Sequence, residues 1–170
     1  MTITNGCSDQ VNIVSQLADP NGHTTAIYSE IESPGEYNVA IGDFPTSNPG
    51  HLQTFNRDLM KAFDGTNYWF GYVLWVQFPG DQTGPVALTY NGDKQQITLT
   101  PYQSRSPKAN QIWGMRVQNK EGFYVLQTYN WPDNEVMDIF GGVAKPGTPI
   151  VAFHYDEGKN QHWQYQPVYA

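Results

Sequence analysis

Two short motifs place amide and aromatic side chains at identical spacing. Asn110-Gln111-Ile112-Trp113 and Asn160-Gln161-His162-Trp163 lie 50 residues apart, and each reads Asn-Gln-x-Trp. Amide groups donate and accept hydrogen bonds without carrying charge, and an aromatic ring presents a flat apolar face. Such residues suit a neutral ligand that has both polar groups and an apolar surface. They suit a loop-rich β-protein without a ligand equally well.

The composition of the chain narrows the class of partner. Lys and Arg number 9 against 16 Asp and Glu, a net charge of −7, so the basic face that nucleic acids and anionic membranes require is not expected. Charged residues make up 15% of the chain, against roughly 25% in ordinary soluble domains, and aromatic residues make up 14%. Sugars are neutral polyols with one apolar face, so this balance of amides and rings favours them as ligands.

The residues that carry out catalysis or bind metals form no familiar arrangement in this sequence. It contains no phosphate-binding loop, nucleophile elbow or paired-cysteine zinc motif. The four histidines are scattered, and the single cysteine, Cys7, cannot form an internal disulfide. We therefore expect a binding protein and not an enzyme, with no cofactor and no metal site.

The elements that would position these residues are short strands. Turn signals recur about every ten residues, which is the pattern of an all-β domain. Asp19-Pro20-Asn21-Gly22 is a good hairpin signal, and Gly141-Gly142 marks another turn. The expected strands are Val11–Ala18, His23–Ile31, Glu36–Ile41, Tyr72–Phe78, Val86–Tyr90, Gln96–Thr100, Gly122–Thr128, Val136–Phe140, Pro149–Tyr155 and His162–Gln166.

One segment has helical spacing instead. Its apolar residues, from Leu52 to Phe63, fall as they would on one face of a helix, and Asp64-Gly65 would end that helix. We therefore expect a single amphipathic helix at about residues 50–64, packed against the rest of the domain. Its polar face has no basic stripe, so the pattern does not predict a membrane-active helix.

The similarity between the two Asn-Gln-x-Trp motifs extends to the residues before them. Val86–Gly92 and Gln96–Thr100 precede the first motif, and Val136–Gly142 and Pro149–Phe153 precede the second. Each copy thus has a strand, a glycine turn, a strand, a polar loop and the motif, over about thirty residues. A weaker third echo ends at Val73-Leu74-Trp75.

These repeats resemble those of the ricin B-type lectin family, whose members carry a Gln-x-Trp signature and fold as a three-lobed β-trefoil. The resemblance is strong over residues 119–167, fair over 84–117 and poor before residue 80. It implies a single all-β domain, residues 1–170, with a divergent first lobe at about 1–80, a second at about 81–118 and a third at about 119–170. The expected helix would be inserted in the first lobe.

The resemblance also implies a sugar site within one repeat. In the family, an Asp before the glycine turn accepts hydrogen bonds from sugar hydroxyls, and an aromatic residue in the next strand stacks on the sugar. The Asn of the motif completes the polar contacts. The corresponding residues here are Asp138, Phe153 and Asn160, with Gln161 in support and His154 beside the ring.

Two departures from the family pattern change this expectation. Val151 stands where many members have a polar residue, which weakens the site or changes its sugar. In the middle repeat, Leu88 takes the place of the Asp and Thr100 the place of the ring, so no site is expected there. The third repeat is therefore expected to hold the one recognisable site.

By the same resemblance, the expected ligands are glycans or glycoproteins that carry galactose or N-acetylgalactosamine, and the expected role is defence. One weak site would need avidity, so a homodimer is expected if the protein agglutinates cells. Residues 1–5 lack the features of a signal peptide, and no stretch approaches the ~20 apolar residues of a membrane span. We expect a cytoplasmic protein, or one released without a classical signal peptide, and no membrane insertion.

Two other functions stay open. β-Trefoils also serve as protease inhibitors, and the loop Gln103–Ala109 contains Arg105, a residue that a trypsin-like protease would accept. A trefoil without a sugar site would be an interaction module. The aromatic run Tyr68–Tyr72 is then the candidate interface, although burial under the expected helix is the simpler expectation.

Overall fold

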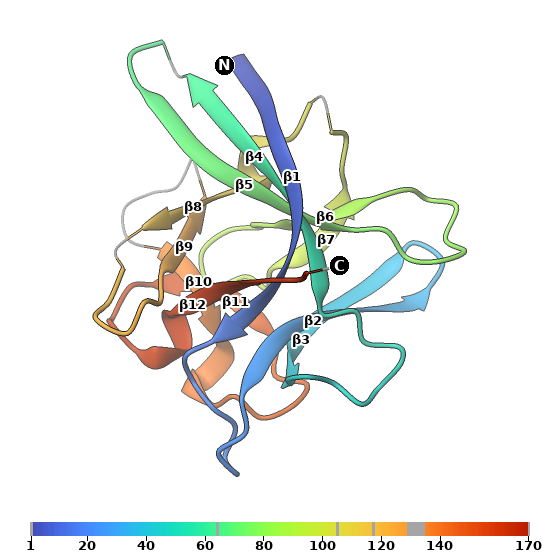
Figure 1. The fold of residues 1–170 in the computed structure, drawn as a ribbon, viewed down its shortest axis with the longest axis vertical. Helices are drawn as coiled ribbons and strands as arrows, with labels where there is room; N and C mark the ends of the chain where they lie inside the picture. Colours follow the sequence, from blue (N-terminus) through green and yellow to red (C-terminus); the bar gives the residue numbers. More distant parts are fainter. Residues whose placement is uncertain (1, 64, 105, 117, 129–134, 170) are drawn as a thin grey trace.

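The computed structural model describes residues 2–63, 65–104, 106–116, 118–128 and 135–169, with residues 2–8, 62, 63 and 69 described by their backbone alone. These residues form twelve β-strands and three short 3-10 helices (Figure 1). The strands are Thr2–Ser15 (β1), Thr25–Ser33 (β2), Glu36–Asp43 (β3), Thr54–Phe63 (β4), Tyr68–Val76 (β5), Val86–Thr89 (β6), Thr98–Pro101 (β7), Ile112–Arg116 (β8), Val125–Thr128 (β9), Glu135–Ile139 (β10), Ile150–His154 (β11) and Trp163–Pro167 (β12). The 3-10 helices are Ala109–Gln111 (η1), Phe140–Gly142 (η2) and Lys159–Gln161 (η3).

Six of the strands close into a barrel. β1 pairs with β12 and β4, β4 with β5, β5 with β8, and β8 with β9, all antiparallel. The ring closes where Tyr124, just before β9, pairs with Trp163 of β12 through backbone hydrogen bonds of 2.7 and 2.8 Å. The other six strands form the hairpins β2–β3, β6–β7 and β10–β11. This arrangement is a β-trefoil, as the repeats predict.

The strands repeat in three successive units of four. The units β1–β4, β5–β8 and β9–β12 each contribute two strands to the barrel and one hairpin. The chain passes from the first unit to the second at the β4–β5 hairpin, between Phe63 and Tyr68. The sequence pattern placed that boundary near residue 80.

A Gln-x-aromatic motif recurs in all three units, and its first copy is Gln53-Thr54-Phe55. The three Gln side chains have equivalent partners. Gln53, Gln111 and Gln161 donate through Nε2 to the backbone oxygens of Asp43, Pro101 and His154 over 2.7, 3.1 and 2.8 Å. Their Oε1 atoms accept from the backbone N–H groups of Thr46, Lys108 and Asp156 over 2.8, 3.2 and 2.8 Å. The Gln therefore fixes a loop in every unit.

The aromatic residue of each motif lies in the shared core. Phe55 and Trp113 are 0% exposed and Trp163 is 1% exposed, and all three belong to one cluster. The third copy of the motif expected at Val73-Leu74-Trp75 is wrong, because Trp75 lies in β5 and does not occupy the position of the motif's aromatic residue. The true copy escapes a search for Asn-Gln-x-Trp because Leu52 replaces the Asn and Phe55 the Trp.

The helix expected at residues 50–64 is wrong, because most of this segment is strand β4. β4 lies between β1 and β5 and forms ladders with both. Phe55 packs in the barrel core, whereas Met60 packs in a second cluster with Val73 and Tyr102. Met60 lies five positions after Phe55, an odd number, so the two side chains lie on opposite faces of the strand. A strand with apolar contacts on both faces lacks strict alternation, and its spacing imitates a helix.

Beyond the barrel, β1, β4 and β5 continue as a three-stranded arm at the top of Figure 1. Tyr68 and Phe70 of β5 are 63% and 59% exposed, so the expected burial of this aromatic run is wrong for both. The Lys61 ammonium lies 3.9 Å from the centroid of the Tyr68 ring. Among the described residues, no helix is both long enough and apolar enough to cross a membrane.

Candidate functional site

The β10–β11 hairpin has one face in the core and the other toward a pocket. The core-facing side chains are all buried, and they are Met137, Ile139, Ile150 and Ala152. In the hairpin register, Asp138 pairs with Val151, and Val136 pairs with Phe153. Because side chains alternate along a strand, Asp138, Val151 and Phe153 share the other face. The pattern of these two strands thus puts a carboxylate beside an aromatic ring.

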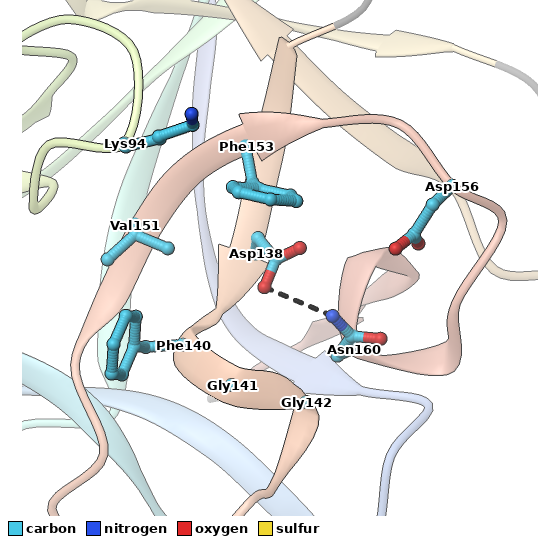
Figure 2. A pocket seen from close by; sticks show the side chains of 9 residues that line it. All are labelled: Lys94, Asp138, Phe140, Gly141, Gly142, Val151, Phe153, Asp156 and Asn160. Atoms are coloured by element: carbon cyan, nitrogen blue, oxygen red, sulfur yellow. Dashed lines mark hydrogen bonds between the residues drawn. The ribbon is translucent and has the colours of Figure 1, made fainter.

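A pocket of about 450 Å³ opens on this face. Its lining consists of Lys94, Asp138, Phe140, Gly141, Gly142, Val151, Phe153, Asp156 and Asn160. Figure 2 shows Asp138 near the centre, with Phe153 on one side and Asn160 on another. The structure therefore brings Asp138, Phe153 and Asn160 together around one cavity, as the family pattern implies for a binding site.

The Asp138 carboxylate is held by two amide side chains. Asn160 Nδ2 donates to Oδ1 over 3.0 Å, and Gln161 Nε2 donates to Oδ2 over 2.7 Å. Asp138 is only 4% exposed, and this burial raises the pKa of its carboxyl group above the ordinary value of 3.8, against the opposing effect of the two hydrogen bonds. Each carboxylate oxygen keeps a second lone pair, so Asp138 can still accept hydrogen bonds from a ligand.

Gln161 lies behind the pocket and supports it. Its side chain is 0% exposed and does not line the cavity. Besides Asp138, its amide bonds the backbone of His154 and Asp156, at the two ends of the turn that follows β11. Gln161 therefore sets the position of Asp138 relative to this loop and does not itself face the ligand.

Asn160 is positioned by a glycine two residues earlier. A Cβ atom at Gly158 would come within 2.3 Å of Asn160 Oδ1 and 3.0 Å of Asp156 Oδ1. Any other residue at this position would therefore push the Asn160 side chain out of its place beside Asp138. The Gly158 carbonyl also accepts from His162 Nδ1 over 2.7 Å, which fixes the same loop.

Phe153 and His154 have different relations to the pocket. Phe153 is half-buried and lines the cavity, whereas His154 is exposed and does not. The two rings are in contact, with centroids 4.2 Å apart and planes tilted by 38°. His154 thus borders Phe153 from outside and contributes its backbone oxygen, not its imidazole, to the arrangement around Gln161.

Sequence reasoning missed several residues of the lining. Phe140 and Asp156 flank the expected positions, and the turn Gly141-Gly142 supplies a floor whose φ angles of 70° and 67° favour glycine. Phe140 and the two glycines lie within the repeated segment Val136–Gly142, but that pattern gave a site role to Asp138 alone. Lys94 comes from the second unit, and no motif signals its approach.

The middle unit has the same frame without the carboxylate. Trp113 Nε1 donates to Leu88 O and Trp163 Nε1 donates to Met137 O, each over 3.0 Å. Leu88 therefore corresponds to Met137, and the position of Asp138 is taken by Thr89. The expectation that Leu88 replaces the Asp is wrong by one residue. The corresponding cavity, about 590 Å³, is lined by Tyr90, Asn91, Gly92, Ala109, Asn110 and Thr128.

The first unit has filled the equivalent space. The hydrogen bond from Ser29 N–H to Leu52 O matches that from Tyr90 N–H to Asn110 O, so Tyr28 stands where Asp138 does. A Cβ at Gly42, the counterpart of Phe153, would come within 2.9 Å of the Tyr28 ring. That ring also stacks on His51, with centroids 3.7 Å apart. The carboxylate and aromatic pair thus occurs in the third unit alone among these hairpins.

A cluster of side chains that could bind a metal ion lies outside the pocket. The side chains of Asp19, His23 and Asp43 offer ligand atoms that all lie within 4.8 Å of one another. Asp19 Oδ1, however, accepts from the backbone N–H groups of Asn21 and His23 over 2.9 and 2.7 Å. These bonds give Asp19 a turn-forming role at the β1–β2 connection.

Comparisons with known proteins bear on the fold. No family model and no curated protein matches the chain. Among solved structures, a designed threefold-symmetric protein, ThreeFoil, is similar with a TM-score of 0.64 and 18% identity, covering 94% of this chain and 99% of that one. A mosquitocidal holotoxin is similar with a TM-score of 0.62 and 18% identity, covering 99% of this chain. This chain spans 18% of the toxin chain. These similarities establish the three-unit fold.

Proposed function

We propose that this protein binds carbohydrate in the third-unit pocket and acts without catalysis. The observation that supports this most is the position of Asp138, whose carboxylate is fixed by Asn160 and Gln161 directly beside Phe153. A pyranose has hydroxyl groups along its edges and an apolar C–H face, so it needs an acceptor and a ring in this relation.

Each pocket residue would have a separate role in binding. The carboxylate of Asp138 accepts hydrogen bonds from two neighbouring sugar hydroxyls, and charged acceptors form the stronger bonds. Phe153 stacks on the apolar face of the sugar. The Oδ1 atom of Asn160 is a further acceptor on the same rim, because its Nδ2 already donates to Asp138. The resemblance to ricin B-type lectins favours galactose or N-acetylgalactosamine as the bound sugar.

The protease-inhibitor alternative rests on a residue outside the described part of the chain. Arg105 is not among the described residues, while its neighbours Ser104 and Ser106 are exposed and Pro107 is buried. No geometry of a reactive loop supports that function, so it stays a prediction from sequence.

The test is a glycan-binding screen that compares the wild type with Asp138→Asn. We expect galactose-type glycans to bind the wild type and to bind the variant about 10-fold to 100-fold more weakly, because a hydrogen bond to a charged group contributes about 1.5–3 kcal/mol. Multivalent display compensates for weak single-site affinity. Failure of every glycan to bind the folded wild type would overturn the proposal.

A matched control separates loss of the site from loss of structure. Asp81 is also a hydrogen-bonded aspartate, which accepts from Tyr37 OH over 2.6 Å, but it lies outside the pocket. Asp81→Asn should leave glycan binding unchanged. Equal loss of binding in both variants would move the site away from Asp138.

A further inference from the structure

A lysine from the second unit enters the third-unit pocket. Lys94 lies in the β6–β7 connection, and its backbone N–H donates to Ala152 O of β11 over 3.0 Å. In the same connection, Gln95 O accepts a hydrogen bond from Ala152 N–H over 3.0 Å, and Ile97 N–H donates to Ile150 O over 2.9 Å. Three backbone hydrogen bonds thus dock this loop on β11, so the place of Lys94 beside the pocket is fixed.

The backbone of Lys94 is in a conformation that lysine rarely adopts. Its φ angle is +57°, in the left-handed region that favours glycine and asparagine. Among the described residues, the other non-glycine residue with positive φ is Glu157, in the loop between Asp156 and Asn160. Residues in sparsely populated backbone regions cluster at functional sites. Lys94 itself lines the cavity, and Glu157 directly follows Asp156, which also lines it.

The pocket has charges of opposite sign at its two ends. Figure 2 shows Lys94 on one side, beyond Val151 and Phe153, Asp138 near the centre and Asp156 on the other side. No carboxylate of a described residue forms an ion pair with Lys94. Its positive charge is therefore not neutralised by these residues, although the whole chain carries a net charge of −7.

We infer that the bound glycan carries an anionic substituent, a sulfate or a carboxylate, that contacts the Lys94 ammonium. The inference rests on the proposed sugar site. A neutral hydroxyl edge of the sugar would lie at Asp138. The anionic group would lie on the Lys94 side of the pocket, away from both pocket carboxylates. The reverse orientation would bring like charges together at Asp138, so the charge pattern selects both the class of glycan and its direction.

The experiment compares matched glycans by isothermal titration calorimetry. The probes are one neutral galactoside, the same galactoside bearing a sulfate, and the same galactoside bearing a carboxylate. We expect at least one anionic form to bind the wild type about threefold to tenfold more tightly than the neutral parent, which is the scale of one partly exposed ion pair. High salt should reduce this preference because it screens exposed charges.

Three variants locate the preference at Lys94. Lys94→Gln should remove the preference, so that the anionic galactosides bind no more tightly than the neutral parent, whereas Lys94→Arg should retain it. Lys145→Gln, which removes an exposed lysine outside the pocket, should behave as the wild type. If Lys94→Gln also loses the neutral galactoside, Lys94 has a structural role and the inference is wrong.

The remaining outcomes separate this inference from the proposed function. Equal or tighter binding of the neutral galactoside by the wild type, still dependent on Asp138, would overturn the role of Lys94 and retain the sugar site. Absence of binding to any of the three probes would overturn both. Preference for only one of the two anionic forms would identify sulfate or carboxylate as the substituent.

Discussion

Asp138 keeps a carboxylate in a nearly buried position, where its hydrogen-bond donors are two amide side chains. Burial without such partners would be costly for a charged group. The equivalent residues of the other units, Tyr28 and Thr89, carry no charge. Among these hairpins, only the third unit therefore stabilises a buried charge, which supports the proposal that Asp138 binds a ligand.

The raised pKa of Asp138 predicts that glycan binding depends on pH. In the proposed site, sugar hydroxyls would donate to the ionised carboxylate, and protonation would remove acceptor capacity. Because burial raises the pKa above 3.8, affinity should fall as the pH is lowered toward that raised value, sooner than for an exposed aspartate. Calorimetric titration of the wild type from about pH 7 to about pH 4 should show this fall. A wild-type affinity that stays constant over this range would contradict it.

Stability should depend on pH in the opposite direction. A carboxyl group with a raised pKa in the folded state contributes stability that is fully present below the unfolded pKa, and the contribution is lost as the pH rises through the folded pKa. The melting temperature of the wild type relative to Asp138→Asn should therefore fall as the pH rises through this window. The variant also supplies the control for binding, since it has no group at this position that titrates there.

The sequence alone was enough to predict three pocket residues, for a physical reason. Asp138, Phe153 and Asn160 lie within one unit, so strand alternation and one motif place them together. Lys94 could not be predicted, because it reaches the pocket from another unit through backbone hydrogen bonds that leave no sequence pattern. Leu88 was assigned in place of Thr89 because both are buried strand residues. The indole hydrogen bond, which no sequence pattern contains, fixes their register.

At the scale of elements, the three hairpins share a frame but differ on the face away from the core. In the β6–β7 hairpin, Thr89 Oγ1 lies 2.7 Å from Thr100 Oγ1, where the third unit has Asp138 and Phe153. Gln111 Nε2 reaches the hydroxyl oxygens of both threonines, at 3.4 and 3.0 Å, much as Gln161 reaches Asp138. The supporting amide is thus already present in the middle unit.

This equivalence predicts that a second site can be built. The double variant Thr89→Asp, Thr100→Phe should place a carboxylate beside a ring near Asn110 and raise the stoichiometry of glycan binding from one to two per chain. Asn110 Nδ2 would have to leave Tyr90 O, to which it donates over 3.0 Å. Calorimetry gives the stoichiometry, with Thr89→Asp alone as the control. A folded double variant that still binds one glycan would show that the site needs residues beyond this set.

Strand β4 shows why one element could not be predicted from the local pattern. Its apolar residues serve two clusters on opposite faces, and pairing with β1 and β5 outweighs the helical spacing. Local pattern cannot distinguish a strand with two buried faces from a helix. Tertiary pairing, which the local pattern does not contain, determines the outcome for residues 54–63.

At the scale of the whole molecule, two copies of the repeat were enough to predict three units. A barrel built from only two of the three units would not close and would leave open strand edges. The first unit gave little signal because Phe55 replaces Trp and Leu52 replaces Asn. The three units nevertheless contribute to the core in the same way, because Phe55, Trp113 and Trp163 fill equivalent positions in one cluster.

Because β12 closes the barrel against β1, we expect the fold to require β12 but not the first residues of β1. β12 pairs with β1 over Val11–Ser15 and supplies Trp163 to the core. A variant that lacks residues 163–170 should show no cooperative thermal unfolding by circular dichroism. A variant that lacks residues 1–8 should fold, because its pairing with β12 begins at Val11. A cooperative transition in the first variant would show that the fold does not require β12 and tolerates an open barrel edge.

The contact between β1 and β12 also affects the order of events during synthesis. Of the twelve strands, β1 leaves the ribosome before the others, yet one of its two partners in the barrel, β12, is made after all the others. Until then, the edge of β1 over residues 11–15 has no partner, and such an edge can pair with another chain. β4 can cover only the other edge while the nascent chain grows. Completion of the barrel, and with it the burial of Trp163, must therefore wait until β12 has left the ribosome.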